Sequence, residues 1–475
     1  MSKKTSGQYF SRKEFLKNSG AATAGLLASP FFNREPKTAP PPNQDKLLFK
    51  GGVVLTMDDD IGDFETADIL VDGDEIRDIA PHIEADADSE VIDCSNRIIM
   101  PGFVDTHRHM WQGCLRNILP NGLLSDYMRV VTGEGRAVFR PEDAYIGNIV
   151  TALSALDAGI TTVLDWSHIG NSPEHSDAAI RGMKESGIRG VYAFGTGSAG
   201  PERRFPEDIR RLRTEHFSSD DQLQTLALGA GIDREQWELA REVGARISVH
   251  VNGTGDLLPM AELLGPDVTC IHCCNLLDEE WQHLADKGAG VSISAPVEMI
   301  MGHGIPPIQQ TLDFGIPPSL SVDVETTVPS NMFTQMRSIY TLQRMQILAR
   351  ERNGEEILPD LLTAKEVLRF ATRNGALHNG LNEITGTITP GKKADLIMLS
   401  KDSINVAPVN NVYGAVVMGM DRANISTVMV NGSIKKWNGE LLFDQLDTVQ
   451  NSAMESQHYI YEKTGWSYEF INAPD

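Results

Sequence analysis

The chain alternates short apolar runs with amphipathic stretches, and this alternation limits its fold more than any other feature of the sequence. Eight apolar runs are typical of strands: 102–107, 159–166, 188–195, 223–230, 246–251, 268–273, 288–294 and 318–323. Amphipathic helical stretches separate them, for example at 144–159, 176–187, 233–244 and 278–288. Parallel strands are covered on both faces and are therefore apolar almost throughout, and eight strand–helix repeats indicate a (β/α)₈ barrel. We predict an α/β fold with a TIM-type barrel over residues 99–388.

Short alternating β segments broken by Gly, Asp and Asn flank this barrel on both sides. They occupy residues 46–98 and return at residues 389–445. This sequence pattern is typical of a small, mostly antiparallel β unit. We expect the two segments to pair into one small β-sandwich domain, and we treat residues 446–475 as a C-terminal tail.

The first 45 residues form a separate segment of leader and linker. A basic start, a modest apolar run and the small residues after it resemble a twin-arginine export leader in which Lys13 takes the place of the second arginine. The apolar run is too short for a stable membrane anchor, and a Pro-rich linker follows it. This predicts export to the periplasm without membrane insertion. The alternative is a disordered N-terminal tail on a cytoplasmic protein.

The charge balance bears on the partners. The chain has 65 acidic and 42 basic residues, a formal net charge of −23, whereas nucleic-acid binders display clustered Lys and Arg. We therefore expect no nucleic-acid partner and favour a small neutral or cationic ligand. Only five cysteines occur, and the three in the run 270–274 are poor disulfide partners for one another, so they are best explained as small buried hydrophobes.

Metal-competent side chains end several of the predicted strands. His107 and His109 close the first, His250 the fifth, His272 the sixth and Asp323 the eighth. Residues two apart on a strand share a face, and the carboxyl ends of barrel strands meet at one mouth. Each histidine alone is more often a hydrogen-bonded core residue, but five such residues at strand ends are an improbable coincidence. Imidazoles with a carboxylate favour one divalent metal, Zn²⁺ first and Fe²⁺ as the alternative.

Four further residues are candidates for substrate binding: Trp111, His168, Glu298 and His303. Trp111 is placed to stack on a planar ring, although simple packing is slightly favoured for a large aromatic side chain. His168 either lines the pocket or holds a ligand histidine through a hydrogen bond. Glu298 is as well explained as a solvated loop carboxylate. His303 lies between glycines in a loop over the expected mouth.

Together these segments resemble a known family. The stretch PGFVDTHRHMWQG, the strand-end histidines, LSVDVETTVPSN and the ending GTITPGKKADLIML are similar to the amidohydrolase superfamily, over about residues 46–445. More narrowly they resemble its mononuclear aminohydrolase branch, which includes cytosine, guanine and S-adenosylhomocysteine deaminases and triazine hydrolases.

The resemblance implies a role for each site residue. It makes His107, His109, His250 and Asp323 the metal ligands, with Asp323 also the general base, and His272 the residue that orients and polarises the substrate. The fourth strand ends without a lysine, so the carboxylated lysine that bridges two metals is missing, and one metal is expected. The implied reaction is hydrolysis of a non-peptide carbon–nitrogen bond, namely deamination of a nitrogen heterocycle or amidine-like group by metal-bound hydroxide.

One position departs from the family pattern. The deaminases of this branch carry a glutamate three residues after the fifth-strand histidine, where it passes protons to the leaving amine, but Gly253 stands there in this chain. Asn252, Glu298 and His303 are candidates to replace it. The departure keeps open a triazine-type hydrolase that displaces chloride or an alkylamine. A non-catalytic, ligand-binding barrel is a third interpretation. By analogy of fold we expect any protein partner to be a further copy of the chain.

Overall fold

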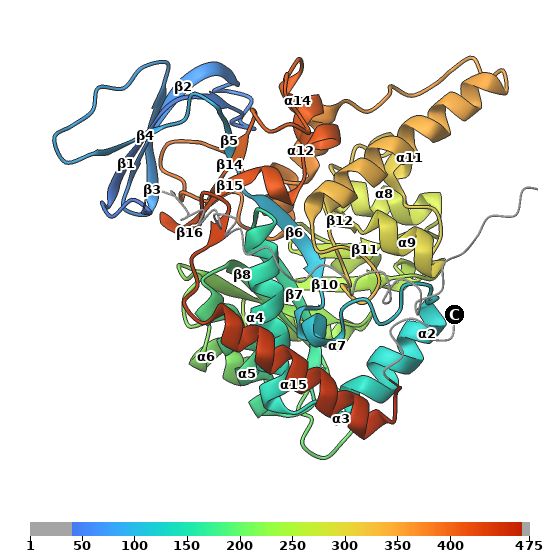
Figure 1. The fold of residues 1–475 in the computed structure, drawn as a ribbon. Helices are drawn as coiled ribbons and strands as arrows, with labels where there is room; N and C mark the ends of the chain where they lie inside the picture. The colour runs from blue at the N-terminus through green and yellow to red at the C-terminus, as the bar shows by residue number, and fades with distance from the viewer. Residues whose placement is uncertain (1–39, 468–475) are drawn as a thin grey trace, which may run out of the picture. The chain divides into compact units, whose positions relative to one another are not determined.

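A computed structural model of the chain describes residues 40–467. An eight-stranded parallel barrel dominates it, and all eight strands coincide with the apolar runs (Figure 1). The strands are β6 (Phe103–Arg108), β7 (Ile160–Gly170), β8 (Arg189–Thr196), β9 (Gln224–Ala230), β10 (Arg246–Val251), β11 (Val268–His272), β12 (Gly290–Ile293) and β13 (Ser319–Leu320). Neighbours in sequence are neighbours in the sheet. The predicted barrel is confirmed.

The ring of strands closes between β13 and β6 at residues that also belong to the predicted site. The Asp323 amide donates to the His107 carbonyl at 2.9 Å, and the His109 amide donates to the Asp323 carbonyl at 2.9 Å. Because β13 is only two residues long, these hydrogen bonds come from a residue beyond its end. The last strand is thus joined to the first by the backbone of the site itself.

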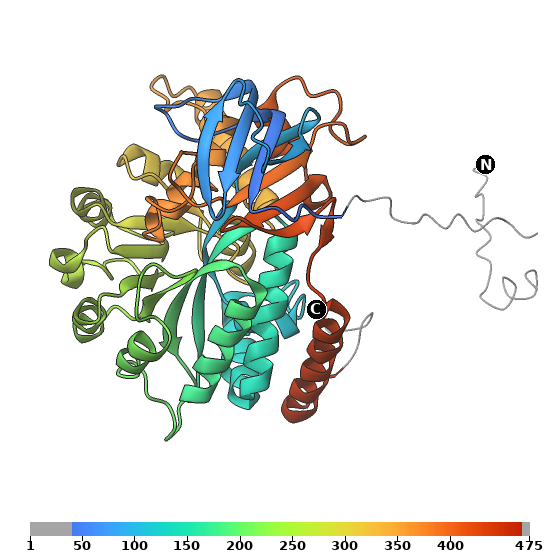
Figure 2. The same ribbon diagram turned by 90° about the vertical axis from the view of Figure 1, so that its left-hand side faces the viewer.

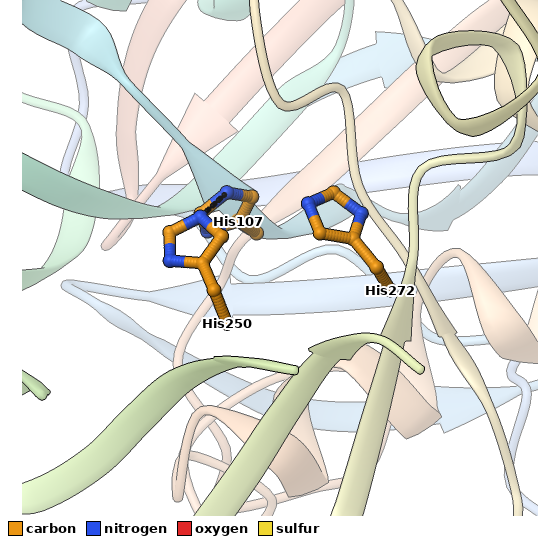
Figure 3. Close-up of side chains that lie close together, drawn as sticks. All are labelled: His107, His250 and His272. Atoms are coloured by element: carbon orange, nitrogen blue, oxygen red, sulfur yellow. Dashed lines mark hydrogen bonds between the residues drawn. The ribbon is translucent and has the colours of Figure 1, made fainter. Parts of the chain in front are cut away.

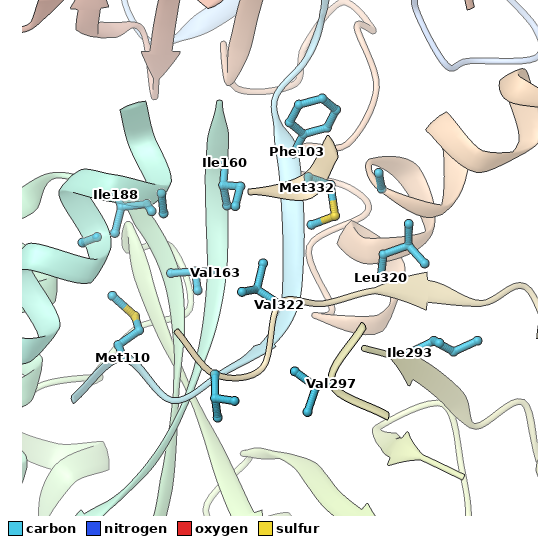
Figure 4. Close-up of a cluster of buried hydrophobic side chains, with 14 of the residues drawn as sticks. Phe103, Met110, Ile160, Val163, Ile188, Ile293, Val297, Leu320, Val322 and Met332 are labelled. Carbon is cyan, nitrogen blue, oxygen red and sulfur yellow. The ribbon is translucent and has the colours of Figure 1, made fainter. Parts of the chain in front are cut away.

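Helices follow the strands and cover the outside of the barrel. They are α4 (Pro141–Asp157), α5 (Pro173–Ser186), α6 (Ile209–Glu215), α7 (Arg234–Glu242), α8 (Asp278–Lys287), α9 (Ala295–Met301), α10 (Ile308–Asp313) and α11 (Met332–Arg352). Sequence signals set their bounds: α5 begins with a proline in its first turn and ends at Gly187, whose φ of 70° suits glycine. Apolar side chains of strands and helices fill the space between the two layers (Figure 4).

Strands from both ends of the described chain form one nine-stranded sheet, drawn in blue and in orange to red above the green barrel strands in Figure 2. They are β1 (Lys46–Val54), β2 (Phe64–Asp72), β3 (Glu75–Ala80), β4 (Glu90–Asp93), β5 (Arg97–Pro101), β14 (Leu396–Ser400), β15 (Ile425–Val430), β16 (Ser433–Trp437) and β17 (Glu440–Leu441). The two segments join where β5 pairs antiparallel with β14. Their predicted association is confirmed.

This second sheet is mixed rather than antiparallel throughout. β1 runs parallel to both β4 and β5, and its pairing with β2 is interrupted by register shifts around Gly52. A long strand with such a bulge bends and serves two sets of neighbours. The alternating sequence pattern shows that these segments are strands, but it does not encode their direction.

The remaining elements connect or cover these two parts. They are η1 (Met110–Leu115), α2 (Leu124–Tyr127), η2 (Met128–Gly135), α3 (Arg136–Val138), η3 (Leu258–Leu263), α12 (Ala364–Phe370), α13 (Arg373–His378), α14 (Val412–Gly414), η4 (Ala415–Gly419), η5 (Arg422–Asn424) and α15 (Leu446–Thr464). The expected tail contains α15, which packs on α4 and η1 and places Val449 and Ile460 in the main core.

The predicted export leader lies almost wholly outside the described residues, which begin at residue 40. Within residues 40–467 no helix combines the length and apolar character needed to cross a membrane.

Candidate metal centre

The five metal-competent residues predicted from the sequence meet at one end of the barrel. His107 belongs to β6, His250 to β10 and His272 is the last residue of β11. His109 follows directly after β6, and Asp323 lies shortly after the end of β13. Figure 3 shows the rings of His107 and His250 side by side, with His272 facing them. Because carboxyl ends of parallel barrel strands share one face, side chains distant in sequence converge there.

The distances within this cluster suit a single shared ion. The His107 Nε2 lies 3.1 Å from an Asp323 carboxylate oxygen, and the His109 Nε2 lies 3.4 Å from the same oxygen. The His250 Nε2 lies 3.2 Å from the His107 Nε2. Candidate ligand atoms of His107, His109 and Asp323 lie within 4.8 Å of one another, as do those of His107, His250 and His272.

The protonation states favoured by the surroundings are those that metal binding requires. Burial, followed by the charge of His107, lowers the pKa of His109 to about 3, and burial lowers the pKa of His250 well below its usual range. Burial alone would raise the pKa of Asp323, but a hydrogen bond from His107 and the neighbouring imidazoles hold it well below its ordinary value. Neutral imidazoles beside an ionised carboxylate form a nitrogen-and-oxygen donor set that fits Zn²⁺.

A hydrogen bond behind His109 fixes the orientation of its ring. Its Nδ1 donates to the Trp166 carbonyl at 2.7 Å, which leaves the lone pair of Nε2 directed into the cluster. The Trp166 indole packs edge-on against His250, with ring centroids 4.5 Å apart, and donates to the Ser248 carbonyl. Partners of this kind set the tautomer and position of metal-binding histidines.

His272 has a different partner from the other histidines. Its Nδ1 lies 3.2 Å from a Glu298 oxygen, while its Nε2 lies 3.8 Å from Asp323 on the pocket side. Burial opposes charge on this ring, yet the Glu298 hydrogen bond and the charges of Asp323 and Glu298 raise the pKa of His272. Glu298 is fully buried and also accepts from the Ser294 amide. It therefore holds His272 from behind and does not line the pocket.

A cavity of about 360 Å³ opens beside the cluster, within the size range of small-ligand sites. It is lined by His109, Leu124, Tyr127, Met128, Thr132, Arg136, Trp166, His168, Thr196, His250, Asn252, His272, Met301, His303, Asp323 and Val324. Asp323 is the only carboxylate among these residues. Of the four residues predicted to bind substrate, His168 and His303 lie at the surface of this cavity.

Trp111 lies one layer behind His168. Its indole N–H donates to the His168 Nδ1 at 2.7 Å, and its ring packs edge-on against Phe139. The His168 ring in turn stacks on His109, with centroids 4.0 Å apart and planes 8° from parallel. Trp111 thus positions a pocket residue, in agreement with the packing alternative considered for it.

The loop after β10 contains the position at which the family glutamate is replaced. The Gly253 amide donates to Asp256 at 2.8 Å, and a Cβ at Gly253 would stand 2.5 Å from that carboxylate. Beside it, Asn252 contacts the His303 Nδ1 at 3.1 Å, and the His303 ring lies 4.3 Å from that of His272. Asn252 and His303 therefore occupy the pocket side of this loop, and neither carries a carboxyl group.

One wall of the cavity was not anticipated from the sequence. Leu124, Tyr127, Met128, Thr132 and Arg136 come from the segment between β6 and α4. The signal that pointed to it is length, because this segment of about 30 residues is far longer than most connections of a strand to the next helix, and long loops at the mouth of a barrel commonly carry function.

The backbone is in the left-handed region at two site residues. His272 has a φ of 70° and Asp323 a φ of 66°, and Cys273 follows with 58°. Non-glycine residues adopt this region at an energetic cost, and such cost concentrates where function constrains the chain. Here the left-handed backbone turns the side chains of His272 and Asp323 toward the other residues of the cluster.

Comparison with known proteins agrees with this geometry. Residues 98–435 match the model of the amidohydrolase family. The chain is 26% identical over 415 residues to a 5′-deoxyadenosine deaminase of Methanosarcina barkeri, covering 82% of this chain and 92% of that protein. It is 27% identical over 423 residues to a 5-methylthioadenosine/S-adenosylhomocysteine deaminase of Symbiobacterium thermophilum, covering 82% and 93%.

Solved structures share the fold at lower identity. A zinc-bound adenosine deaminase from Xanthomonas campestris superposes with a TM-score of 0.75 at 20% identity, covering 89% of this chain and all (100%) of that one. The zinc complex of the atrazine chlorohydrolase TrzN from Arthrobacter aurescens gives 0.74 at 22% identity, covering 86% and 100%. With the family match spanning most of the chain and the ligand set assembled at the barrel mouth, this protein belongs to the amidohydrolase family and is a metal-dependent amidohydrolase.

Proposed function

We propose that the protein is a zinc-dependent deaminase that removes an exocyclic amino group from a nitrogen heterocycle, with adenine-type rings as the first candidates. The observation that carries this proposal is the convergence of His107, His109, His250 and Asp323 at the floor of a small cavity, with His272 beside them. The relatives named as deaminases of adenosine-type nucleosides support the choice of ring.

The ligand set would hold zinc through three imidazole nitrogens and one carboxylate oxygen. A zinc ion in such a site lowers the pKa of water toward about 7 and so supplies a nucleophile at neutral pH. The donor set excludes Mg²⁺ and Ca²⁺ as good fits, because these ions prefer oxygen ligands.

The chain's own residues then perform the proton transfers. Asp323 is ionised and central, so it can accept the proton of the attacking water and then return it to the leaving amine. His272 points its Nε2 into the cavity and donates to the ring nitrogen or carbon substituent where negative charge develops. Trp166 and the apolar side chains of Leu124, Met128 and Met301 exclude water and accept a planar ring.

The test is release of ammonia by the purified, zinc-loaded protein. The panel contains 5′-deoxyadenosine, 5′-methylthioadenosine, S-adenosylhomocysteine, adenosine, guanine and cytosine. Turnover of at least one ring, lost after zinc removal and regained on adding zinc, is the expected result. A zinc-replete, folded protein that releases no ammonia from any of them would argue against the proposal.

One observation favours a second candidate, a hydrolase that displaces a halide. Within the described residues the cavity contains no carboxylate other than Asp323, and Gly253 stands where a proton-donating glutamate is expected. Chloride leaves without needing a proton, whereas an amine does need one. Chloride release from atrazine by the same preparation, faster than ammonia release from any aminated ring, would select this candidate instead.

A further inference from the structure

An arginine without an acidic partner lines the cavity. Arg136 is half-buried in α3, and its Nε is buried without a hydrogen-bond partner. Within the described part of the chain, its guanidinium makes one contact to a polar atom, a long one from Nη1 to the His168 carbonyl at 3.5 Å. Among residues 40–467 no carboxylate forms an ion pair with it, although the protein carries 65 acidic residues against 42 basic ones.

Two arginines of residues 40–467 are fully or almost fully buried, and both are paired with acids. Arg108 is fully buried and binds Asp105 at 2.7 Å and Glu325 at 3.1 Å. Arg189, also buried, makes a two-pronged contact with Asp395. The half-buried Arg246 also lacks an acid, but its Nη2 donates to two backbone carbonyls. Arg136 has neither an acid nor such a pair of carbonyls, and leaving a half-buried guanidinium in that state is costly.

The groups around Arg136 do not supply the missing charge. Tyr127 lies nearby, but burial raises the pKa of this phenol far above its usual range, so the phenol is neutral. The other charge that acts on Arg136 is that of Arg203, an exposed cation whose Nη1 contacts the Thr196 hydroxyl at the cavity edge. The local potential at this wall is therefore positive, in contrast to the net charge of −23 of the chain.

The position of Arg136 also sets its distance from the reacting centre. It contacts the backbone of His168, and the His168 ring stacks on His109 of the proposed zinc site. A group bound at Arg136 is thus one side chain away from the ligand cluster and inside the same 360 Å³ cavity.

We propose that the substrate of this enzyme carries a carboxylate, which Arg136 binds while the aminated ring lies over the zinc ligands. This inference deepens the proposed function and rests on it, because it takes the bound molecule to be one that the enzyme deaminates. The two Nη nitrogens of one guanidinium form a planar fork that matches the two oxygens of a carboxylate. Arg203 at the edge adds attraction on entry. The overall acidity of the chain suggested neutral or cationic ligands, and the cavity wall reverses that expectation locally.

The test compares ligands that differ only in the anionic group. Calorimetry on the zinc-loaded full chain measures dissociation constants for 4-aminopyrimidine-5-carboxylate and its 5-carboxamide. Adenosine 5′-phosphate and adenosine form a second pair that distinguishes a phosphate from a carboxylate. We expect the carboxylate to bind about 10–100-fold more tightly than the carboxamide, and the phosphate to gain less over adenosine. A gain confined to the phosphate pair would overturn the assignment to a carboxylate.

Variants locate the effect. Arg136→Gln is expected to abolish the preference for the carboxylate while changing carboxamide binding less than about threefold, and Arg136→Lys should keep part of it. Arg129→Gln is the matched control, because Arg129 is an exposed neighbour that contacts Glu134. It should behave as wild type.

The outcomes separate this inference from the proposed function. If no ring releases ammonia but the preference exists and disappears in Arg136→Gln, the carboxylate site stands and the deaminase proposal fails. If a ring is deaminated while wild-type protein binds carboxylate and carboxamide equally, the carboxylate site is refuted and the deaminase proposal stands. The wild-type ratio decides this even if Arg136→Gln does not fold.

Discussion

The two ends of the barrel both hold buried histidines, but they use them differently. At the mouth, the ring nitrogens of His107 and His250 face each other at 3.2 Å beside Asp323, and a cavity opens over them. At the opposite end of the barrel, which we call the base, the His378 Nδ1 lies 2.8 Å from the Ser319 hydroxyl, and the His378 carbonyl accepts from the Thr269 hydroxyl. The base histidine is bound by hydroxyl and backbone partners, whereas the mouth histidines direct lone pairs at a common point.

The space around the two sets of rings differs as well. The base is closed, since a Cβ at Gly290 would stand 2.8 Å from the His378 ring. The mouth is bounded by loops of variable length, where side chains can be exchanged without disturbing the strands. Burial of a histidine therefore does not identify a site. A site is indicated by several imidazole nitrogens that converge on one carboxylate beside a cavity.

The largest effect is expected on zinc content and turnover, when a histidine of the mouth is replaced and compared with one of the base. His109→Ala should lower both the zinc content and the turnover of the preferred substrate, the latter by at least about 1,000-fold, because the ligand set loses one of its four members. His378→Gln removes a buried histidine of the base and should leave zinc stoichiometry near that of wild type. Elemental analysis and steady-state kinetics of the two variants check this. Equal zinc loss in both would abolish the distinction drawn here.

A smaller effect at the mouth tests positioning by Glu298. Glu298→Gln keeps the size of the side chain but removes the charge that orients His272 and raises its pKa. Turnover should fall about 10–100-fold with zinc content unchanged, and the pH dependence of kcat should shift to lower pH. Folding is monitored by thermal melting. A variant that loses activity only in proportion to lost folded protein, with an unmoved pH profile, would contradict the positioning role.

The contrast between mouth and base also explains what sequence could predict. The eight strands and the strand-end residues His107, His109, His250, His272 and Asp323 could be found because strand periodicity and barrel topology together determine which side chains meet. His378 lacks this signal, because it ends the short helix α13, whereas His272 ends the strand β11.

Features that depend on loops or on side-chain direction were beyond the sequence. Glu298 was expected at the cavity surface, but it turns back to His272 because α9 starts directly after β12 and carries it behind the site. Arg136 and Tyr127 went unnoticed. They flank the π-helical segment η2, which does not follow the 3.6-residue period by which a helix is recognised in a sequence. The mixed directions of the second sheet likewise follow from tertiary pairing, which period-2 alternation does not specify.

His378 at the base should affect the free energy of unfolding rather than turnover. Burial, with the charge of Arg246, lowers the pKa of His378 to about 3, from 6.5 for a free side chain. The unfolded chain thus binds this proton first as pH falls, so the stabilisation is complete above pH 6.5 and is lost progressively between pH 6.5 and 3. Between pH 7.5 and 5.5 wild-type protein should lose about 1.4 kcal/mol of unfolding free energy from this group.

Chemical denaturation of wild type and His378→Gln at both pH values measures this contribution by difference, because the other titrating groups are common to the two proteins. The variant should be less stable at pH 7.5 and show the shallower pH dependence. Parallel pH profiles in the two proteins would mean that His378 is not kept neutral by the fold.

The smallest expected effect concerns the hydroxyl network inside the barrel, between base and mouth. The Ser292 hydroxyl lies 2.7 Å from that of Thr106 and 2.9 Å from that of Ser321, and all three side chains are buried. Ser292→Ala should cost about 1 kcal/mol of unfolding free energy, because Thr106 and Ser321 each keep another hydroxyl partner, in Ser319 and Ser294. Ser218→Ala, at an exposed position, is the control and should change stability by less than about 0.5 kcal/mol. Turnover should stay within about threefold of wild type in both. If Ser292→Ala instead lowered zinc content or kcat severely, the barrel interior would be coupled to the metal centre. Ser292 would then belong to the chemical mouth and not to the structural base.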